Sequence, residues 1–201
     1  MKVNTRKIQK LNTRKKIIET AYKVFSEKGF SVPSSIIAKE AGVSHGSIFA
    51  HFPTINDLLV SLLSDFGDKM GARLHVLAKK TDSVENLLKE HLKVLKEYET
   101  FYSRLISEIN ILPDEAKNTF AIIQSTVAFH FASVIECEIE KGTVKKLPIH
   151  MLFNTWLGLV HYYLLNKDFF SESNESVIER YSSELLSTYL NLIKNERRVY
   201  E

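Results

Sequence analysis

The fold is decided by the stretch IAKEAGVSHGSI, residues Ile37 to Ile48. Its apolar spacing predicts two short helices that cross at a small residue, Ala38, and are joined by a turn at Gly42, which tolerates a positive φ. Ser44 is a good N-cap for the second helix, and the first residues of such a helix can project into a major groove. The stretch therefore predicts a helix-turn-helix over about residues 33–52.

The remainder of the 201-residue chain also reads as helical, because apolar residues recur at helical spacing and no long period-two alternation occurs. One helix should follow a Thr13 cap and end at Gly29, and another should start at a capping box of Thr54 and Asp57. Further helices are expected over about 84–98, 101–112, 114–141, 149–166 and 175–195. The predicted class is all-α.

Charge is distributed unevenly along the chain. Residues 1–52 carry ten Lys or Arg against three acids, whereas the whole chain has a net charge of only +3. Residues 1–16 contain seven basic side chains and no acid. This pattern suggests a polyanion-binding head with a basic arm, although a solvated basic tail would look the same.

The composition argues against several other classes of protein. A single cysteine, Cys137, excludes an internal disulfide framework. The N-terminus has no apolar signal segment, and the apolar run over 151–165 is too short and interrupted to span a bilayer. We expect a cytoplasmic protein without a membrane partner. No phosphate-binding loop, nucleophile motif or histidine–carboxylate metal pattern is recognisable, so we expect no enzyme, cofactor or metal site.

The segment from Thr13 to Leu59 resembles the tetracycline-repressor (TetR) family, above all in AGVSHGSIFAHFP, residues Ala41 to Pro53. The resemblance implies a three-helix DNA-binding head over residues 1–54 and a larger helical domain over 55–201. The larger domain would begin with a long fourth helix, bind the ligand and dimerise through its last long helices. Two positions depart from the family pattern. Phe49 stands where a tyrosine is common, and Ile55 where Lys or Arg is common, so two phosphate donors are missing.

The resemblance implies that residues at the start of the recognition helix meet bases or phosphates and that His51 lies near the DNA backbone. We expect the basic arm to offset the missing phosphate donors. The candidate DNA-binding residues are Lys7, Lys10, Arg14, Ser34, Ser35, Ser44, His45, Gly46, Ser47, Phe49 and His51.

Two segments in the second half are apolar nearly all round, and a helix without a polar face must be covered on both sides. A second copy of the chain could provide that cover, although a monomeric bundle could do so as well. The candidate dimer-interface residues are Leu152, Leu159, Tyr163, Ile178, Tyr181, Leu185, Tyr189 and Leu192.

Aromatic residues with a few polar companions on four neighbouring helices suggest an apolar effector pocket, although the same residues could simply fill the core. The candidate pocket residues are Phe101, Tyr102, Leu105, Glu108, Phe120, Gln124, Phe129, His130, Trp156 and Tyr162. The predicted function is a homodimeric regulator, expected to be a repressor, that a small apolar effector releases from a palindromic operator. The alternatives are an activator of the same architecture and a helical ligand-binding or adaptor protein with a degenerate head.

Overall fold

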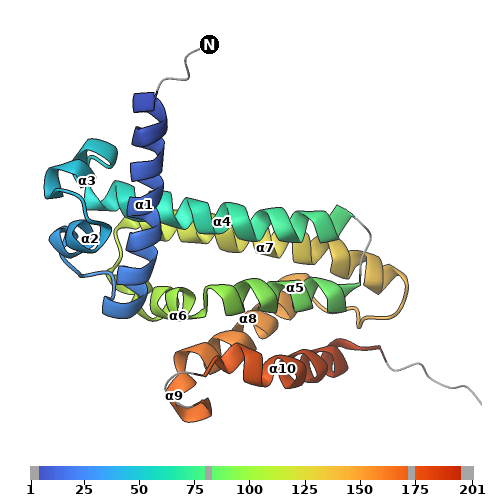
Figure 1. Cartoon of the computed structure of the whole chain (residues 1–201). Coiled ribbons are helices and arrows are strands. Elements are labelled where there is room, and N and C mark those ends of the chain that lie inside the picture. The colour runs from blue at the N-terminus through green and yellow to red at the C-terminus, as the bar shows by residue number, and fades with distance from the viewer. Residues whose placement is uncertain (1–4, 80–82, 172–174, 196–201) are drawn as a thin grey trace, which may run out of the picture. The chain divides into compact units, whose positions relative to one another are not determined.

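The computed structural model describes residues 5–79, 83–171 and 175–195, and its regular elements there are helices, as the sequence predicts (Figure 1). Outside the helices, the described residues form an isolated antiparallel bridge between Val144 and Lys194. The helices are α1 (Thr5–Lys28), α2 (Ser34–Ala41), α3 (His45–His51), α4 (Ile55–Lys79), α5 (Val84–Glu97), α6 (Glu99–Glu108), η1 (Ile109–Ile111), α7 (Asp114–Glu140), α8 (Ile149–Leu165), α9 (Lys167–Phe170) and α10 (Val177–Ile193).

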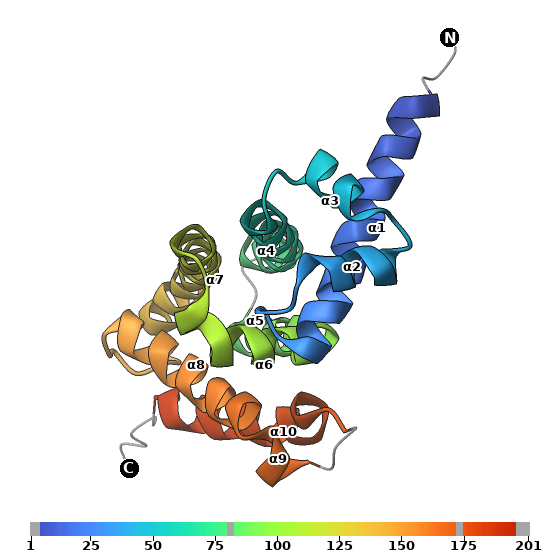
Figure 2. The same ribbon diagram turned by 90° about the vertical axis from the view of Figure 1, so that its left-hand side faces the viewer.

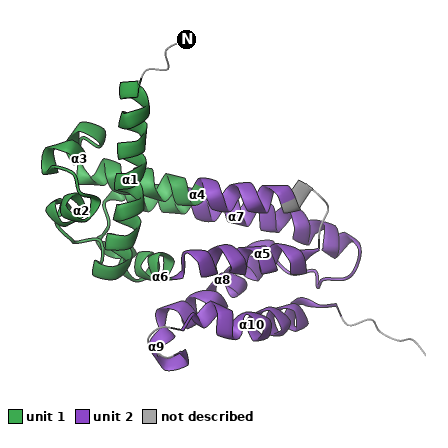
Figure 3. Ribbon diagram, viewed as in Figure 1, with its two compact units in different colours: residues 1–67, 100–121 green, residues 68–99, 122–201 purple. Residues whose placement is uncertain are grey.

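The chain divides into two compact units, which Figure 3 shows in two colours. Unit 1 contains residues 1–67 and 100–121, and unit 2 contains residues 68–99 and 122–201. Unit 1 is thus larger than the head expected over residues 1–54. The first half of α4 and most of α6 belong to it because Leu58, Leu62 and Phe101 are buried there.

Side-chain caps begin several helices where the sequence predicts them. Ser44 accepts a hydrogen bond from the Ser47 amide at 3.1 Å. Before α4, the amide of Thr54 donates to the carboxylate of Asp57 at 2.8 Å, and the Asp57 amide donates back to the Thr54 hydroxyl at 3.1 Å. The expected Thr13 cap is wrong, because α1 starts at Thr5 and the Thr13 hydroxyl donates to the Gln9 carbonyl inside the helix.

The end of α1 is held by a residue from α6. Gly29 adopts a φ of +84°, and the Phe30 ring stacks on Phe25 with centroids 5.2 Å apart, as expected for this type of helix ending. The Phe30 amide then donates to the Glu108 carboxylate at 2.8 Å. This hydrogen bond links α6 to the turn after α1. Within α6, Glu108 also accepts a hydrogen bond from Arg104 at 3.0 Å.

The core of unit 2 contains α5, α8 and α10 (Figure 2). Trp156 is buried there, and its indole N–H donates to His91 Nδ1 at 3.1 Å. The Tyr189 hydroxyl donates to the Leu152 carbonyl at 2.7 Å, and burial raises the pKa of Tyr189. Glu99 fixes the start of α10 by accepting from the amides of Val177 and Ile178.

Among the helices that the structure describes, α7 has the length and composition of a membrane-crossing segment. Core helices of globular proteins have the same properties, and 39% of the relevant window is buried within the chain. The apolar run that the sequence analysis considered, over 151–165, does not meet the same criterion among the described residues.

Candidate nucleic-acid interface

The helix-turn-helix forms within unit 1 from α2, α3 and the turn between them. Gly42 has a φ of +63°, and the Val43 amide donates to the Ala38 carbonyl at 3.0 Å, which closes the turn. Ala38 and Ile48 are buried, so the crossing of the two helices is tightly packed. The first turn of α3 is consequently fixed with its polar side exposed to solvent.

That exposed side carries His45, Gly46 and the hydroxyl pair of Ser44 and Ser47, whose oxygens lie 2.8 Å apart. A Cβ added to Gly46 would lie 4.0 Å from the nearest atom, Ser44 Oγ, so the space in front of this glycine is open. An open backbone position at the start of a recognition helix allows DNA to approach closely.

His45 is restrained in the free protein by two contacts. Its Nε2 lies 2.9 Å from the Ser34 hydroxyl, and its ring meets Phe49 edge-on at 5.0 Å. Nδ1 is therefore the ring nitrogen left to meet a base edge while this bond persists. Ser34 is the first residue of α2, after Pro33 as N-cap, and neither Ser34 nor the exposed Ser35 caps that helix with its side chain.

The basic arm is helical from Thr5 onward, and residues 1–4 lie outside the described ranges. The positions of Lys7, Lys10 and Arg14 recur at helical spacing, so their side chains share one face of α1. Arg14 is partly engaged within the protein, because it donates to Ser61 at 3.2 Å and its guanidinium lies 4.8 Å from the Phe52 ring centre. Lys7 and Lys10 are exposed.

His51 ends α3 close to this basic face. Burial, and then the charges of Lys10 and Arg14, lower its pKa. Its Nδ1 is buried and has no hydrogen-bond partner among the residues that the structure describes. In the tautomer with its proton on Nε2, the neutral ring of His51 can donate one hydrogen bond to a phosphate oxygen without adding charge.

Lys16 is a further basic residue at this site, and the candidate set did not include it. Its Nζ lies 3.6 Å from the place where a Cβ on Gly42 would be, so the ammonium stands over the turn of the helix-turn-helix. The sequence signal was present, because Lys16 belongs to the basic run of residues 1–16. The sequence does not show which basic residue of this run lies at the turn, because that depends on where α1 crosses the turn in the folded protein.

We expect Lys7 and Lys10 to contribute phosphate contacts without base specificity. Replacing both by Gln should flatten the slope of log K against log salt by about 2, since each neutralised phosphate contributes roughly 0.9. The control is the pair Lys23→Gln and Lys28→Gln, two exposed lysines nearer the other end of α1. Salt titrations of DNA binding that give the same slope for both double variants would contradict a role for the arm.

The predicted effector-pocket residues are not brought together within either unit. Phe101, Tyr102, Leu105 and Phe120 are buried in unit 1, where the Phe101 ring lies 4.8 Å from Tyr22. Glu108 belongs to the same unit and binds the Phe30 amide. These residues fill the core of unit 1, and that they line a pocket together with the other five stays a prediction.

The other five candidate pocket residues belong to unit 2 and also have different surroundings. Trp156 is buried against His91, and burial and then His75 lower the pKa of the buried His130. Gln124 is half-buried. Phe129 and Tyr162 are 71% and 58% exposed and so do not enclose a pocket within the chain.

Four of the predicted dimer-interface residues, Leu152, Ile178, Leu185 and Tyr189, are buried inside a single chain. The prediction is corrected for these four, because α8 and α10 pack against each other and against α5 through them. The other four remain accessible: Leu159, Tyr163 and Tyr181 are half-buried, and Leu192 is exposed.

Comparisons with known proteins agree with this geometry. The model of the family described as "Bacterial regulatory proteins, tetR family" matches residues 17–62. The HTH-type transcriptional regulator YuxN of Bacillus subtilis is 34% identical over 128 residues, which is 60% of this chain and 44% of that protein. The HTH-type transcriptional repressor Rv3405c of Mycobacterium tuberculosis is 35% identical over 80 residues, 39% of this chain and 42% of that protein. The matched stretches thus span less than half of these relatives.

The fold as a whole resembles solved structures more extensively. A TetR-family transcriptional regulator from Agrobacterium tumefaciens superposes with a TM-score of 0.76, covering 92% of this chain and 99% of that one at 17% identity. The buried crossing of α2 and α3 and the exposed start of α3 define a helix-turn-helix protein. Over residues 17–62 the chain is similar to bacterial regulatory proteins of the TetR family, and its fold as a whole is similar to that of solved TetR-family structures.

Proposed function

We propose that this protein is a transcriptional regulator that binds a palindromic operator as a homodimer, with α3 of each copy in a major groove. The observation that carries the proposal is the exposed start of α3, with His45, Gly46 and the Ser44–Ser47 pair, beside the basic face of α1. Two copies related by a two-fold axis would present two such helices to successive grooves. The protein would act in the cytoplasm.

We assign the dimer contact to the exposed face of α8. Met151, Thr155, Gly158, Tyr162 and Leu165 recur at helical spacing on the side opposite the buried residues of α8, and all five are exposed. Phe169, in α9, continues the series and is 87% exposed. Leu159, the neighbour of Gly158 in the sequence, is half-buried. A row of large apolar side chains around an exposed glycine is suited to close approach of a second helix.

Replacing Gly158 by Arg should therefore weaken dimerisation by about 100-fold, because a charge would be buried without a partner. A Cβ at Gly158 meets no atom of the described residues within 4 Å, and glycine is a poor helix former, so the monomer should remain folded. Sedimentation equilibrium measures the effect, with Ser133→Arg on the exposed side of α7 as the control. An unchanged dimer of Gly158→Arg would exclude this face.

His45 should contribute to recognition of the operator. His45→Ala is expected to cost about 1–3 kcal/mol of binding free energy on the operator and little on a scrambled duplex, because one base contact is lost. Gly46→Leu should be worse, since its side chain would occupy the space that DNA needs. Ser34→Ala should cost less than His45→Ala, because it removes only the group that restrains the imidazole. Equal losses on both duplexes would show that His45 reads no base.

The direct test of the proposed function is footprinting of the protein on the DNA upstream of its own gene, followed by titration of the protected sequence against random duplex at fixed salt. A two-fold symmetric footprint supports the proposal. Equal affinity for operator and random DNA would instead indicate a helical binding protein with a degenerate head.

We further propose that the protein is a repressor whose operator affinity falls when a small effector binds. The effector would shift the population toward dimers whose heads no longer match successive grooves. Transcription in vitro from the protected promoter decides the sign, because a repressor lowers the yield of transcript and an activator raises it.

A further inference from the structure

A groove in unit 2 is lined by residues that have no role in the proposed DNA binding. It is an open hollow of about 470 Å³ between α5 and α10, and we call it the α5–α10 groove. Leu92, Ile178 and Leu186 are buried residues that contribute apolar surface to it. Its volume lies within the range of small-molecule sites, about 300–1,000 Å³.

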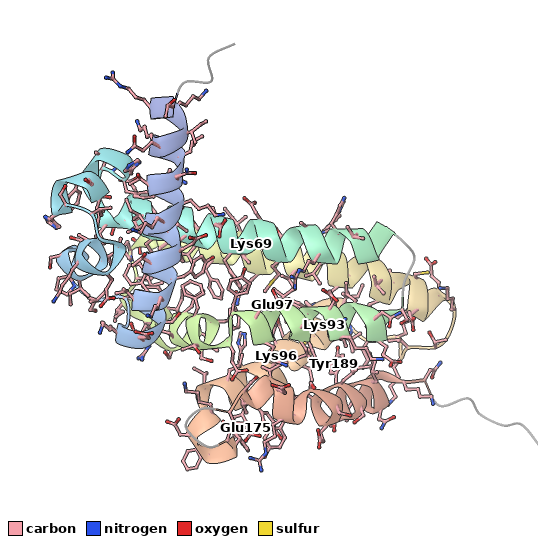
Figure 4. All side chains as sticks on the ribbon, viewed as in Figure 1. Lys69, Lys93, Lys96, Glu97, Glu175 and Tyr189 are labelled. Carbon is pink, nitrogen blue, oxygen red and sulfur yellow. The ribbon has the colours of Figure 1, made fainter. Side chains whose placement is uncertain are left out.

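The α5 side of the groove is basic. Lys89, Lys93 and Lys96 line it at spacings that place them on one face of the helix. Figure 4 labels Lys93 and Lys96 on α5, beside α10. The α10 side contributes two hydroxyls, from Ser182 and Ser183, and the single acid of the lining, Glu179.

Each lysine has an acidic neighbour in the free protein. Lys89 pairs with Glu85 and Lys93 with Glu90 along α5, whereas Lys96 reaches Glu179 on α10 at 2.7 Å. The lysine side chains are 45–69% exposed. Pairs this exposed contribute only about 0–1 kcal/mol each, so a ligand anion can take over these ammonium groups at little cost.

The start of α10 cannot itself provide the anion contact. The amides of Val177 and Ile178 already donate to Glu99, and the Glu179 amide donates to the Ser176 hydroxyl at 3.0 Å. The Ser182 hydroxyl likewise donates to the Glu179 carbonyl at 3.4 Å, so the lysines and the Ser183 hydroxyl are the donors that the groove offers.

We propose that the α5–α10 groove binds a small amphipathic anion, with an alkyl chain on the apolar residues and a carboxylate or phosphate head at the lysines. The combination of three ammonium groups with an apolar floor disfavours a cation, and it offers a neutral polar molecule no gain from the charges. None of the groove residues belongs to the DNA-contacting set or to the exposed α8 face. The inference therefore does not rest on the proposed function.

Isothermal titration of the full chain, without DNA, tests the proposal with decyl phosphate below its critical micelle concentration. We expect saturable binding that inorganic phosphate and decyl maltoside, which supply only the head charge or only the chain, do not reproduce. Binding of either control as tight as that of decyl phosphate would overturn the proposal. Binding only to phosphatidylglycerol vesicles, and not to the free amphiphile, would assign the groove to a membrane surface and overturn it too.

Two variants locate the site. Lys89→Glu with Lys93→Glu should weaken binding about tenfold or more, because two charge-assisted contacts are lost. Lys141→Glu with Lys167→Glu makes the same charge change at exposed positions outside the groove and should have little effect.

Ser183→Glu places an acid in the groove and should also weaken binding, whereas Ser187→Glu, one turn later on α10, should not. Circular dichroism confirms that each variant is folded. Affinity that the groove variants leave unchanged, or that all four variants reduce equally, would place the amphiphile elsewhere and overturn the proposal.

Discussion

Replacing Gly29 by alanine is expected to lower the free energy of unfolding by about 2–5 kcal/mol. A residue with a Cβ loses about 1–2 kcal/mol in the left-handed conformation that Gly29 adopts. The added Cβ would also lie 2.8 Å from a carboxylate oxygen of Glu108. The carboxylate can swing away, but the Phe30 amide then loses its acceptor, which costs a further 1–3 kcal/mol or so.

Gly142 provides a matched control for this prediction. Its φ is +71°, but a Cβ there meets no atom within 4 Å in the part of the chain that the structure describes, so Gly142→Ala should cost only about 1 kcal/mol of backbone strain. Chemical denaturation followed by far-UV circular dichroism gives both values. In a Glu108→Ala background the cost of Gly29→Ala should shrink towards that of Gly142→Ala. If the cost of Gly29→Ala stays as large in that background, the hydrogen bond between Glu108 and the Phe30 amide does not contribute to the free energy of unfolding.

Acidification should destabilise unit 2 through His91. Burial, and then the charge of His161, lower the pKa of His91 from 6.5 to about 4. Protonation would also remove the Nδ1 lone pair that accepts the Trp156 hydrogen bond. Between pH 6.5 and pH 4 the imidazole of His91 is protonated in the unfolded chain and neutral in the folded protein. The free energy of unfolding should therefore fall as the pH drops through this window, by about 3 kcal/mol in all.

The measurement follows the fluorescence of Trp156, the only tryptophan of the chain, during denaturation at several pH values. In His91→Gln the amide oxygen can still accept from the indole N–H, but the titrating group is gone. The pH dependence of this variant should be weaker by the contribution of one proton. His51, His130 and His161, whose pKa values are also lowered, are present in both proteins and cancel in the difference. Equal pH dependence would show that His91 is not the responsible group.

The helix-turn-helix could be predicted almost completely from the sequence, because local signals determine it. The glycine at a positive φ, the Ser44 cap and the burial of Ala38 and Ile48 are all found where the spacing places them. The extent of α1 could not be predicted in the same way. Thr13 has the character of a cap, but the helical preference of the residues before it prevails, and its hydroxyl bonds back into the helix.

The residues of the larger helices could be assigned to helices but not to partners. Periodicity shows that a helix has an apolar side, and it does not show which helix covers that side. Tyr189 therefore looked as suitable for a dimer contact as Leu192, but the structure buries the first and exposes the second. Glu108 looked like a polar group of a pocket, because its partner, the Phe30 amide, lies 78 positions away in the sequence.

The helical arm at the start of α1 has a consequence for how its length can vary. Because α1 continues without interruption from Thr5 to Lys28, an inserted residue before the core of the head turns the preceding side chains by about 100° around the helix axis. One extra residue would rotate Lys7 and Lys10 away from Arg14, whereas three or four would nearly restore their direction one turn farther out. A change in the length of this helical arm therefore changes the direction in which its lysines point as well as how far they reach. In a flexible tether, only the reach would change.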